Sequence, residues 1–304
     1  MDFKNGSELL DLCGKNQMAI SDVMKRREME AAGMTENEVE EKMKKALSVM
    51  DASAHEPLER EMKSMGGLIG GEAKKLKENS KKGMPLCGNV VTKAITYAMA
   101  VLEVNASMGV IVAAPTAGSS GVLPGVLFAL KEEYGLKDEV LRKGLYTAGA
   151  VGYLFMRNAS VSGAQAGCQA EVGSASAMAA AAAVEMMGGT PEQALSAATG
   201  ALSNLLGLVC DPVGGLVENP CQNRNASGAV NALINAQQAL AGIRQKIPFD
   251  EMAQVMLNVG RSLPFELKES ALGGCAAAPS VCGHAVCTDN GCEKKIRRNG
   301  KRIF

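Results

Sequence analysis

The stretch that decides the fold is AAAAAVEMMGGTPEQ, which spans residues 179–193. Residues 179–183 form an unbroken alanine run, and alanine is the strongest helix former and adds no polar group, so the run predicts a buried helix. Thr190, Pro191 and Gln193 then form a helix start, because threonine caps the helix, proline suits its first position and glutamine closes a capping box. We therefore expect two successive helices joined by a glycine-rich turn.

Outward from this stretch, helix-length apolar segments alternate with glycine-rich turns over the chain from Val90 onward. Asp138 is expected to start a helix that carries Leu141 and Leu145 on one face. Asp250 is expected to start another, with an inner face of methionines and valines. No alternation of polar and apolar residues is long enough to predict a strand, so the sequence predicts an all-α fold.

The segment before residue 84 is also expected to be helical. Ser7 is placed to cap a first helix, and Thr35 with Glu38 forms a capping box for a later one. Residues 74–83 are polar and rich in lysine, so they are expected to form a solvated connection. We divide the chain into a helical N-terminal segment, a helical core and a cysteine-rich basic tail, at residues 1–83, 84–274 and 275–304.

The composition describes a protein with a sizeable core and no net charge. Hydrophobic residues make up 47% of the 304 residues and charged residues 21%, while basic and acidic residues number 32 each. This balance argues against nucleic acid or an anionic membrane as a partner. The longest apolar stretch, residues 109–130, is broken by Pro115 and Pro124, and the N-terminus is unlike a signal peptide. We therefore expect a cytoplasmic protein without a membrane segment.

Nine cysteines in a reducing compartment are better explained as thiols or metal ligands than as disulfides. Cys168, Cys210 and Cys221 each lie beside glycine or proline, where the backbone can bend sharply and expose its amides to sulfur. None belongs to a C-x-x-C pair, which disfavours a zinc knuckle. Three dispersed thiolates could hold three irons of a [4Fe–4S] cluster and leave the fourth open. The spacing alone, however, favours buried structural thiols.

A second candidate feature is the loop TAGSSG, residues 116–121, which precedes an apolar segment at residues 122–130. Such a loop at a helix N-terminus presents free amides to an anion, and a substrate carboxylate is the natural one. Ser119 and Ser120 are expected to hydrogen-bond substrate, with Thr116 in the same loop. A tight packing turn is the alternative, and the phosphate-loop motif is absent. A second polar group, which could bind substrate or tune a cluster, consists of Asn158, Ser160 and Ser162.

Six motifs, in order along the chain, resemble the α-type domain of bacterial iron–sulfur serine dehydratases. They lie at residues 112–125, 158–163, 167–173, 210–214, 220–226 and 269–274, and the stretch MGGLIGG at residues 65–71 also matches. The resemblance implies an all-helical fold and a [4Fe–4S] cluster held by Cys168, Cys210 and Cys221. It also implies serine catabolism linked to gluconeogenesis: L-serine becomes pyruvate and ammonia without PLP. An open iron would take the hydroxyl group and a base the Cα proton.

The chain departs from the one-chain members of that family. It lacks their extra domain with Ser-Ser-His-Thr and Gly-x-Gly-His motifs, so the resemblance implies a heterodimer in which a separate β chain supplies the base. His55 is expected to be a capping or surface residue rather than the base. In the tail, the resemblance makes Cys282 the candidate fourth cluster ligand. A zinc site that includes His284, or a disordered tail with incidental cysteines, is the alternative.

Two other functions stay open. A related lyase acting on L-threonine or L-cysteine would carry the same cluster, and a non-catalytic iron–sulfur or zinc-binding scaffold could use the cysteine-rich tail. Clusters that only transfer electrons are usually fully ligated by protein, so an open iron argues against the scaffold. Serine dehydration is therefore the function that we expect.

Overall fold

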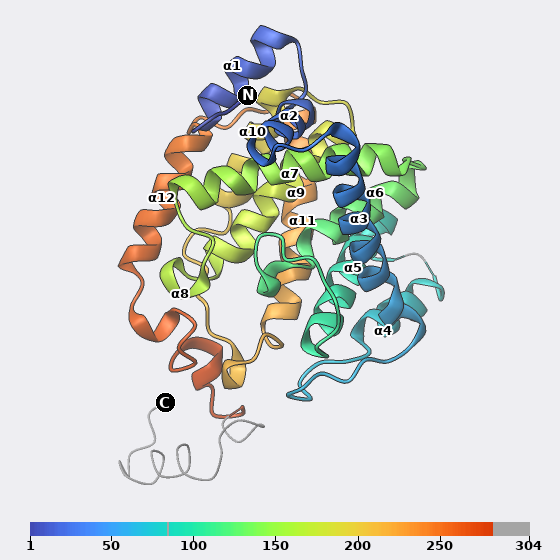
Figure 1. The fold of residues 1–304 in the computed structure, drawn as a ribbon. Coiled ribbons are helices and arrows are strands. Elements are labelled where there is room, and N and C mark those ends of the chain that lie inside the picture. Colours follow the sequence, from blue (N-terminus) through green and yellow to red (C-terminus); the bar gives the residue numbers. More distant parts are fainter. Residues whose placement is uncertain (84, 282–304) are drawn as a thin grey trace.

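The structure is all-α over the residues that it describes. This computed structural model describes residues 1–83 and 85–281, and in those ranges it contains helices, turns and one isolated bridge between Cys210 and Lys268. The all-α prediction is confirmed (Figure 1). The α-helices are, in chain order, α1 Gly6–Asn16, α2 Ile20–Ala32, α3 Glu36–Glu59, α4 Glu72–Ser80, α5 Gly88–Ala106, α6 Val122–Tyr134, α7 Asp138–Asn158, α8 Gly163–Ala166, α9 Ser174–Met186, α10 Pro191–Ser203, α11 Cys221–Leu240 and α12 Phe249–Ser262. Shorter turns are the 3-10 turns η1 Ala117–Ser119, η3 Val213–Gly215, η4 Phe265–Leu267 and η5 Gly274–Ala277, and the π-turn η2 Gln169–Gly173.

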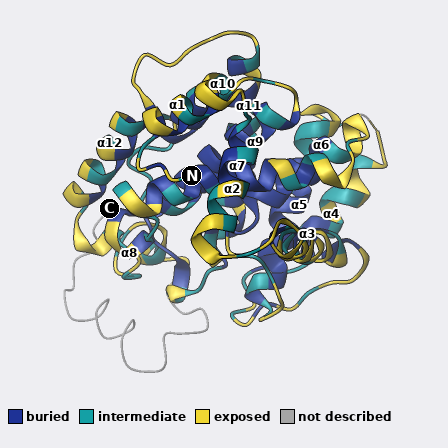
Figure 2. Cartoon of the chain, turned by 45° about the horizontal axis from the view of Figure 1, so that its top comes forward, coloured by how far each residue is buried: buried dark blue, intermediate teal, exposed yellow. Residues whose placement is uncertain are grey.

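Helix α9 lies at the centre of the molecule (Figure 2). Every residue of the helix except Glu185 is buried, and most of these residues are alanine or serine. Small side chains let helices approach closely, and α9 packs against α6, α7, α10 and α11. The buried helix that the alanine run predicts is confirmed.

A close contact between α5 and α6 depends on glycine. A Cβ atom added at Gly121 would overlap with the carbonyl oxygen of Ala98, and one at Gly125 would lie 2.8 Å from that of Ala94. Because no side chain separates the two backbones, the N-terminal end of α6 rests directly on α5. This contact fixes the point at which the loop before α6 meets the helical core.

Both predicted capping boxes are present. Thr35 and Glu38 cap α3, and Thr190 and Gln193 cap α10 with Pro191 in the first turn. In each box the side chain of the third helical residue accepts a hydrogen bond from the cap residue's own amide, at 2.8 Å for Thr35 and 2.9 Å for Thr190. These helix starts are predictable because the interacting residues are only three positions apart.

The predicted cap at Ser7 is wrong. Helix α1 is capped by Asn5, whose side-chain oxygen accepts a hydrogen bond from the Glu8 amide at 2.7 Å. Ser7 lies inside the first turn, and its amide donates to the carboxylate of Asp250 at 3.2 Å. Asp250 lies in the first turn of α12, as expected, but its other oxygen accepts from the Gly6 amide at 2.7 Å. A residue from the far end of the chain therefore completes this helix end.

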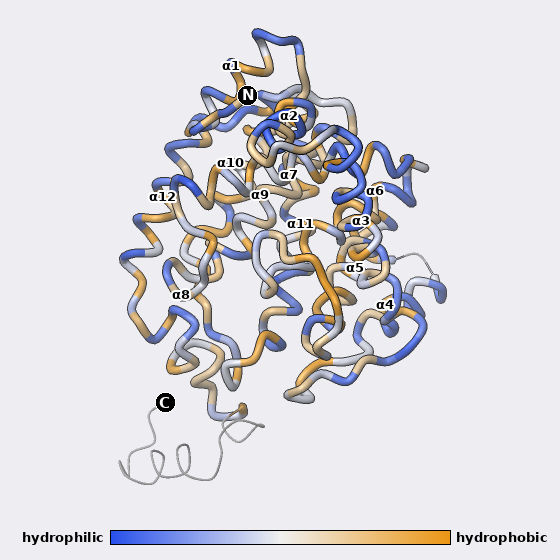
Figure 3. The backbone as a smooth tube through the Cα atoms, in the orientation of Figure 1, coloured by the Kyte–Doolittle hydropathy of each residue, from blue (hydrophilic) through white to orange (hydrophobic). Residues whose placement is uncertain are grey.

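The lysine-rich stretch is solvent-exposed as its composition predicts, since none of residues 74–83 is buried, but residues 74–80 belong to a helix rather than to a connection. Helix α4 is hydrophilic along most of its length (Figure 3). Its buried residue Ala73 donates an amide hydrogen bond at 2.9 Å to Glu103, a fully buried residue of α5. Helix α4 also packs against α3, and such tertiary contacts stabilise a short helix that composition alone does not indicate.

The N-terminal helices pack onto the later ones. Helix α2 contacts α7, and α3 contacts α5, α6 and α7. None of the helices in residues 1–83 and 85–281 combines the length and the apolar character needed to cross a membrane. The division of the chain after residues 83 and 274 stays a prediction.

The glycine contact at α6 can be tested by adding a methyl group. Gly121→Ala should lower the free energy of unfolding by about 3 kcal/mol, because its Cβ would overlap with the backbone of α5. Gly149→Ala is the matched control: a Cβ there meets nothing closer than the Met24 methyl carbon at 3.9 Å. It should stabilise α7 by about 0.5–1 kcal/mol through helix propensity. Urea unfolding measures both, and equal stability of the two variants would contradict this packing.

Candidate active site

The three predicted cluster cysteines lie on three different segments that meet at one end of the core. Cys168 lies between α8 and η2, Cys210 follows α10, and Cys221 is the first residue of α11. Cys168 and Cys210 are 4% and 5% exposed, and Cys221 is half-buried. Burial, and then the neighbouring Cys168 thiol, raises the pKa of Cys221 to about 12. Burial likewise raises the pKa of Cys210, and the neighbouring thiols of Cys168 and Cys221 raise it further. The three thiols therefore lie near enough to one another for their charges to interact.

Cys168 is held in place by its neighbour Gln169, which is fully buried. The side-chain oxygen of Gln169 accepts a hydrogen bond from the Gly207 amide at 2.9 Å. Its backbone amide donates to the carbonyl oxygen of Leu208 at 3.0 Å. These two bonds join the segment of Cys168 to the loop that leads to Cys210.

Arg224 of α11 fixes the other side of that loop. Its Nη1 atom donates to the Asp211 carboxylate at 2.6 Å and to the carbonyl oxygen of Val209 at 2.8 Å. Asp211 is 2% exposed, so this ion pair is largely shielded from water. Burial raises the pKa of the Cys168 thiol to about 12, although the nearby Arg224 acts in the opposite direction. One guanidinium group therefore holds the residues on both sides of Cys210.

The loop that carries Thr116 is tied to α11 by Asn225, which is fully buried. The side-chain oxygen of Asn225 accepts from the Gly121 amide at 3.0 Å. Its nitrogen donates to the carbonyl oxygens of Gly118 at 2.8 Å and Cys221 at 2.9 Å. A single side chain therefore fixes this loop relative to Cys221.

The two predicted substrate-binding serines are buried inside their loop. Ser119 and Ser120 are both 0% exposed. The Ser119 hydroxyl lies 3.0 Å from that of Thr116, and the Ser120 hydroxyl donates to the carbonyl oxygen of Ala117 at 2.7 Å. Thr116 is half-buried, and its hydroxyl donates to Glu171 at 2.7 Å. A contact of Ser119 or Ser120 with substrate stays a prediction, while their observed bonds stabilise the loop.

The second predicted polar group makes local structural bonds. The Asn158 side chain donates to the carbonyl oxygen of Lys4 at 2.7 Å, which ties the end of α7 to the N-terminal residues. The Ser160 hydroxyl donates to Gln165 at 2.7 Å and accepts from the Ser162 amide at 3.1 Å. None of these bonds reaches the cysteines, and a contact of Asn158, Ser160 or Ser162 with substrate stays a prediction.

Glu171 of the π-turn η2 lies between the Thr116 loop and Cys210, and its sequence context alone assigns it no role. Its Oε1 atom accepts a hydrogen bond from the Thr116 hydroxyl at 2.7 Å, and its Oε2 atom lies 3.7 Å from the Cys210 sulfur. Two glycines pack against the carboxyl group: a Cβ at Gly163 would lie 2.5 Å from Oε2, and one at Gly118 would lie 3.3 Å from Oε1. Burial raises the pKa of this carboxyl group. Single π-turns often occur at functional sites.

The MGGLIGG stretch is joined to the site through Glu218, which lies in the loop before α11 and is 2% exposed. The Glu218 carboxylate accepts hydrogen bonds from the Ser64 hydroxyl at 2.7 Å and from the amides of Gly66 at 2.6 Å and Leu68 at 2.9 Å. A buried carboxylate with three donors is well compensated for its loss of water. The stretch therefore folds around one side chain from the loop of the third cysteine.

The first part of the tail docks beside the cysteine loops. Asp211 accepts a hydrogen bond from the Cys275 amide at 2.6 Å. Gly274 adopts a φ of +59°, and a Cβ there would overlap with the Asp211 carboxylate, so this position requires glycine. The Cys275 side chain is exposed. The predicted fourth ligand Cys282 and the alternative zinc ligand His284 lie outside the described residues.

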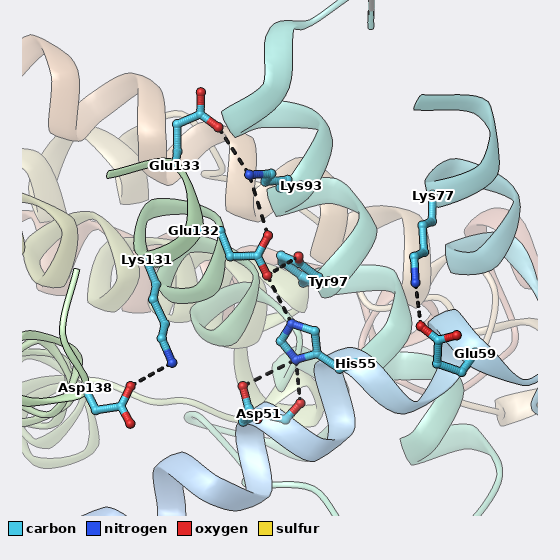
Figure 4. Close-up of polar contacts among 10 residues, drawn as sticks. All are labelled: Asp51, His55, Glu59, Lys77, Lys93, Tyr97, Lys131, Glu132, Glu133 and Asp138. Carbon is cyan, nitrogen blue, oxygen red and sulfur yellow. Dashed lines mark hydrogen bonds and ion pairs between the residues drawn. The ribbon is translucent and has the colours of Figure 1, made fainter. Parts of the chain in front are cut away.

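His55 of α3 contacts polar residues where α3 meets α5 and α6 (Figure 4). Its Nδ1 atom lies 2.8 Å from the carbonyl oxygen of Asp51, and its Nε2 atom lies 3.3 Å from the Glu132 carboxylate. The ring also packs against Tyr97, whose hydroxyl donates to Glu132 at 2.6 Å. His55 is thus a half-exposed surface residue that connects α3 with α5 and α6.

A single-ion metal site is absent from the part of the chain that the structure describes. No three His, Cys, Asp or Glu side chains there converge on a point where one ion could bind. An iron–sulfur cluster imposes a different requirement, because each of its thiolates binds a separate iron. Three thiols that come from separate segments fit that requirement, because each of them can bind its own iron.

Comparison with known proteins identifies the family. Residues 15–276 match the family model described as serine dehydratase alpha chain. The chain is 50% identical over 278 residues to the Bacillus subtilis protein named "Probable L-serine dehydratase, alpha chain", with 91% of this chain and 92% of the relative covered. It is 45% identical over 271 residues to the "L-serine dehydratase, alpha chain" of Peptoniphilus asaccharolyticus, with 89% and 93% covered. A longer Streptomyces coelicolor protein named "L-serine dehydratase" is 39% identical over 286 residues, which cover 92% of this chain but 62% of the relative.

The all-α fold and the match to the alpha chains define the class of the protein, an all-α lyase subunit. The chain belongs to the serine dehydratase alpha chain family. Its length corresponds to that of the separate alpha chains among these relatives, since the alignments cover more than nine-tenths of them.

The burial of the cysteines can be tested by alkylation of cluster-free protein. At pH 8, iodoacetamide should modify the exposed Cys87 readily and should spare Cys168 and Cys221. Burial raises the pKa of both latter thiols to about 12, which lowers their thiolate fraction about 1,000-fold relative to an ordinary thiol. Mass spectrometry of the peptides gives each rate, and similar rates at all three positions would show that the cysteine loops are open.

Proposed function

We propose that this chain is the cluster-bearing subunit of an iron–sulfur-dependent L-serine dehydratase, which converts L-serine to pyruvate and ammonia. The observation that carries the proposal is the contact chain from Thr116 through Glu171 to Cys210, with Cys168 and Cys221 close enough to interact with the Cys210 charge. Relatives named as L-serine dehydratase alpha chains match nearly the whole chain, which supports the choice of substrate.

The three cysteines are proposed to hold a [4Fe–4S] cluster. Soft thiolate ligands suit such clusters, and each of the three comes from a different segment, so each can bind a different iron. When bound, the cluster supplies an open iron that acts as a Lewis acid toward the substrate hydroxyl. Cys282 is the proposed fourth ligand in the resting state, and Cys275 is the tail cysteine whose backbone is bonded beside the site.

The remaining groups of the site are proposed to bind and orient the amino acid. The glycine–serine loop ends at the N-terminus of α6, where the helix dipole favours the substrate carboxylate, while the Gly121 amide is bonded to Asn225. The half-buried Thr116 is held by Glu171, so its hydroxyl has a fixed position. Asn225 fixes the loop to α11, and such preorganisation lowers the entropic cost of reaching the reactive geometry.

The base that takes the Cα proton is proposed to come from a β chain. Histidine is the usual base near neutral pH, and the sequence contains only His55 and His284. The contacts of His55 are with Asp51 and Glu132, away from the cysteine loops. The longer Streptomyces relative has a further segment in the same chain, since the alignment covers 62% of it. A separate chain in a heterodimer can provide the equivalent part.

Replacing any one of the three cysteines with alanine should abolish the brown chromophore of the anaerobically reconstituted protein. Each thiolate binds a separate iron, and loss of one leaves that iron without a protein ligand. Iron and sulfide analysis with visible absorbance measures the effect. Cys13→Ala is the matched control, because Cys13 is a buried thiol of α1 outside the site. A full cluster spectrum in Cys210→Ala would overturn the assignment.

The chain alone should bind the cluster but produce no pyruvate, and adding the β chain should restore turnover of L-serine. The physical reason is the missing base, since proton transfer from Cα contributes about 10²–10⁴-fold to such rates. A coupled pyruvate assay under anaerobic conditions gives the answer. Full activity of the lone chain would remove the need for a partner and make His55 the first residue to replace. Faster turnover of L-threonine or L-cysteine than of L-serine would change the substrate instead.

A further inference from the structure

The carboxyl groups around the cysteines differ in how far their hydrogen-bonding capacity is used. Glu218 accepts three hydrogen bonds from a neighbouring loop. Asp211 accepts from Arg224 and from the Cys275 amide. Glu269 is exposed, so water can solvate it. Of the four acidic side chains near the cysteines within residues 1–83 and 85–281, three are therefore compensated by protein or water.

Glu171 is the exception among the described acidic residues of the site. Its Oε1 atom accepts one hydrogen bond, from the Thr116 hydroxyl at 2.7 Å. Among the described residues, the one partner of its Oε2 atom is the weakly donating thiol of Cys210, at 3.7 Å. A thiol is a weak donor, and a cysteine that ligates a metal has lost its proton and donates nothing. A carboxylate has about four acceptor positions, so most of the capacity of Glu171 is unused.

The surroundings of Glu171 hold its carboxyl group in one place. The backbone at Gly163 and Gly118 approaches it so closely that a Cβ at Gly163 would lie 2.5 Å from Oε2 and 2.9 Å from the Cys210 sulfur. The Thr116 hydroxyl fixes the other oxygen. A partly shielded, oriented and under-compensated carboxylate favours a cationic ligand, because such a partner supplies both charge and N–H donors.

The amino acid that this site is proposed to bind carries one such cation. We propose that Glu171 receives the α-ammonium group of the substrate and thereby selects α-amino acids over hydroxy acids of the same size. This inference rests on the proposed function, which places the substrate between the Thr116 loop and the cysteines. The ammonium group would donate to Oε2, on the side that faces Cys210, while Thr116 keeps Oε1 in position.

The test compares two ligands that differ in the ammonium group. L-alanine has the ammonium group but no hydroxyl, and 3-hydroxypropanoate has the hydroxyl but no ammonium group. Their dissociation constants are measured by anaerobic calorimetry on the cluster-loaded complex with the β chain. Glu171→Gln should weaken L-alanine binding and raise the KM for L-serine by about 10–100-fold, the usual loss for one charge-assisted hydrogen bond. Binding of 3-hydroxypropanoate should change less than about twofold.

Matched controls separate this role from a structural one. Glu185→Gln removes a half-buried carboxyl group of α9 that is bonded to Thr147 rather than to the cysteine site, and should leave both dissociation constants unchanged. Iron content and visible absorbance report whether Glu171→Gln keeps its cluster. If that variant loses the cluster, Glu171→Asp keeps the charge but shortens the side chain, and should weaken L-alanine alone.

Equal weakening of both ligands, or no weakening of L-alanine, overturns the proposal. A fall in kcat with an unchanged KM does the same, because it would place Glu171 in the chemical step rather than in ammonium binding. Failure of the proposed function looks different: wild-type complex would then make no pyruvate from L-serine. L-alanine binding that depends on Glu171 would support the ammonium site even in that case, and binding independent of Glu171 would refute it.

Discussion

Helix α9 can occupy the centre of the molecule because its surface consists mainly of alanine and serine side chains. Small side chains on all sides allow α7, α10, α11 and α6 to approach it at once, and the core gains dense packing in place of large aromatic groups. Aromatic residues make up only 3% of the chain, which fits a core that is built in this way. The glycine contact between α5 and α6 follows the same rule of close backbone approach.

The site lies where this tightly packed core ends and loops begin. Helix α9 continues backward through the π-turn η2 to Cys168, so the position of that cysteine follows directly from the central helix. The described loops around Cys168 have no repeating backbone hydrogen bonds of the helical kind. Polar side chains bond to their backbone groups instead. Gln169 and Arg224 bond to the backbone of the loop before Cys210, Asn225 to that of the Thr116 loop, and Glu218 to that of the MGGLIGG stretch. Such satisfied polar networks rigidify loops at a functional site.

Local signals in the sequence predict much of the fold. The capping boxes at Thr35 and Thr190 and the alanine run of α9 depend on residues within a few positions, and all three are confirmed. The prediction at Ser7 fails because Asn5 caps α1, while Asp250 from α12 accepts the amides of Gly6 and Ser7 in the first turn. Helix α4 is missed because its support comes from tertiary contacts with α3 and α5.

For the site, the cysteine motifs indicate the three segments that meet, but not the side chains that join them. The spacing contains a usable signal: Arg224 and Asn225 follow Cys221 by three and four positions, and Glu171 follows Cys168 by three, which places each about one helical turn from a cysteine. Glu218 carries no comparable signal, because its partners in the MGGLIGG stretch lie far away in the sequence.

The central claim is that the three cysteines hold a cluster with one iron open to substrate. Mössbauer spectroscopy of the anaerobic complex, loaded with ⁵⁷Fe and measured before and after addition of L-serine, tests it most directly. The account predicts that about a quarter of the iron signal, that of the single open iron in a four-iron cluster, changes its parameters on addition of L-serine. A four-iron cluster whose spectrum is identical with and without L-serine, or the absence of any cluster in the loaded protein, would contradict the account.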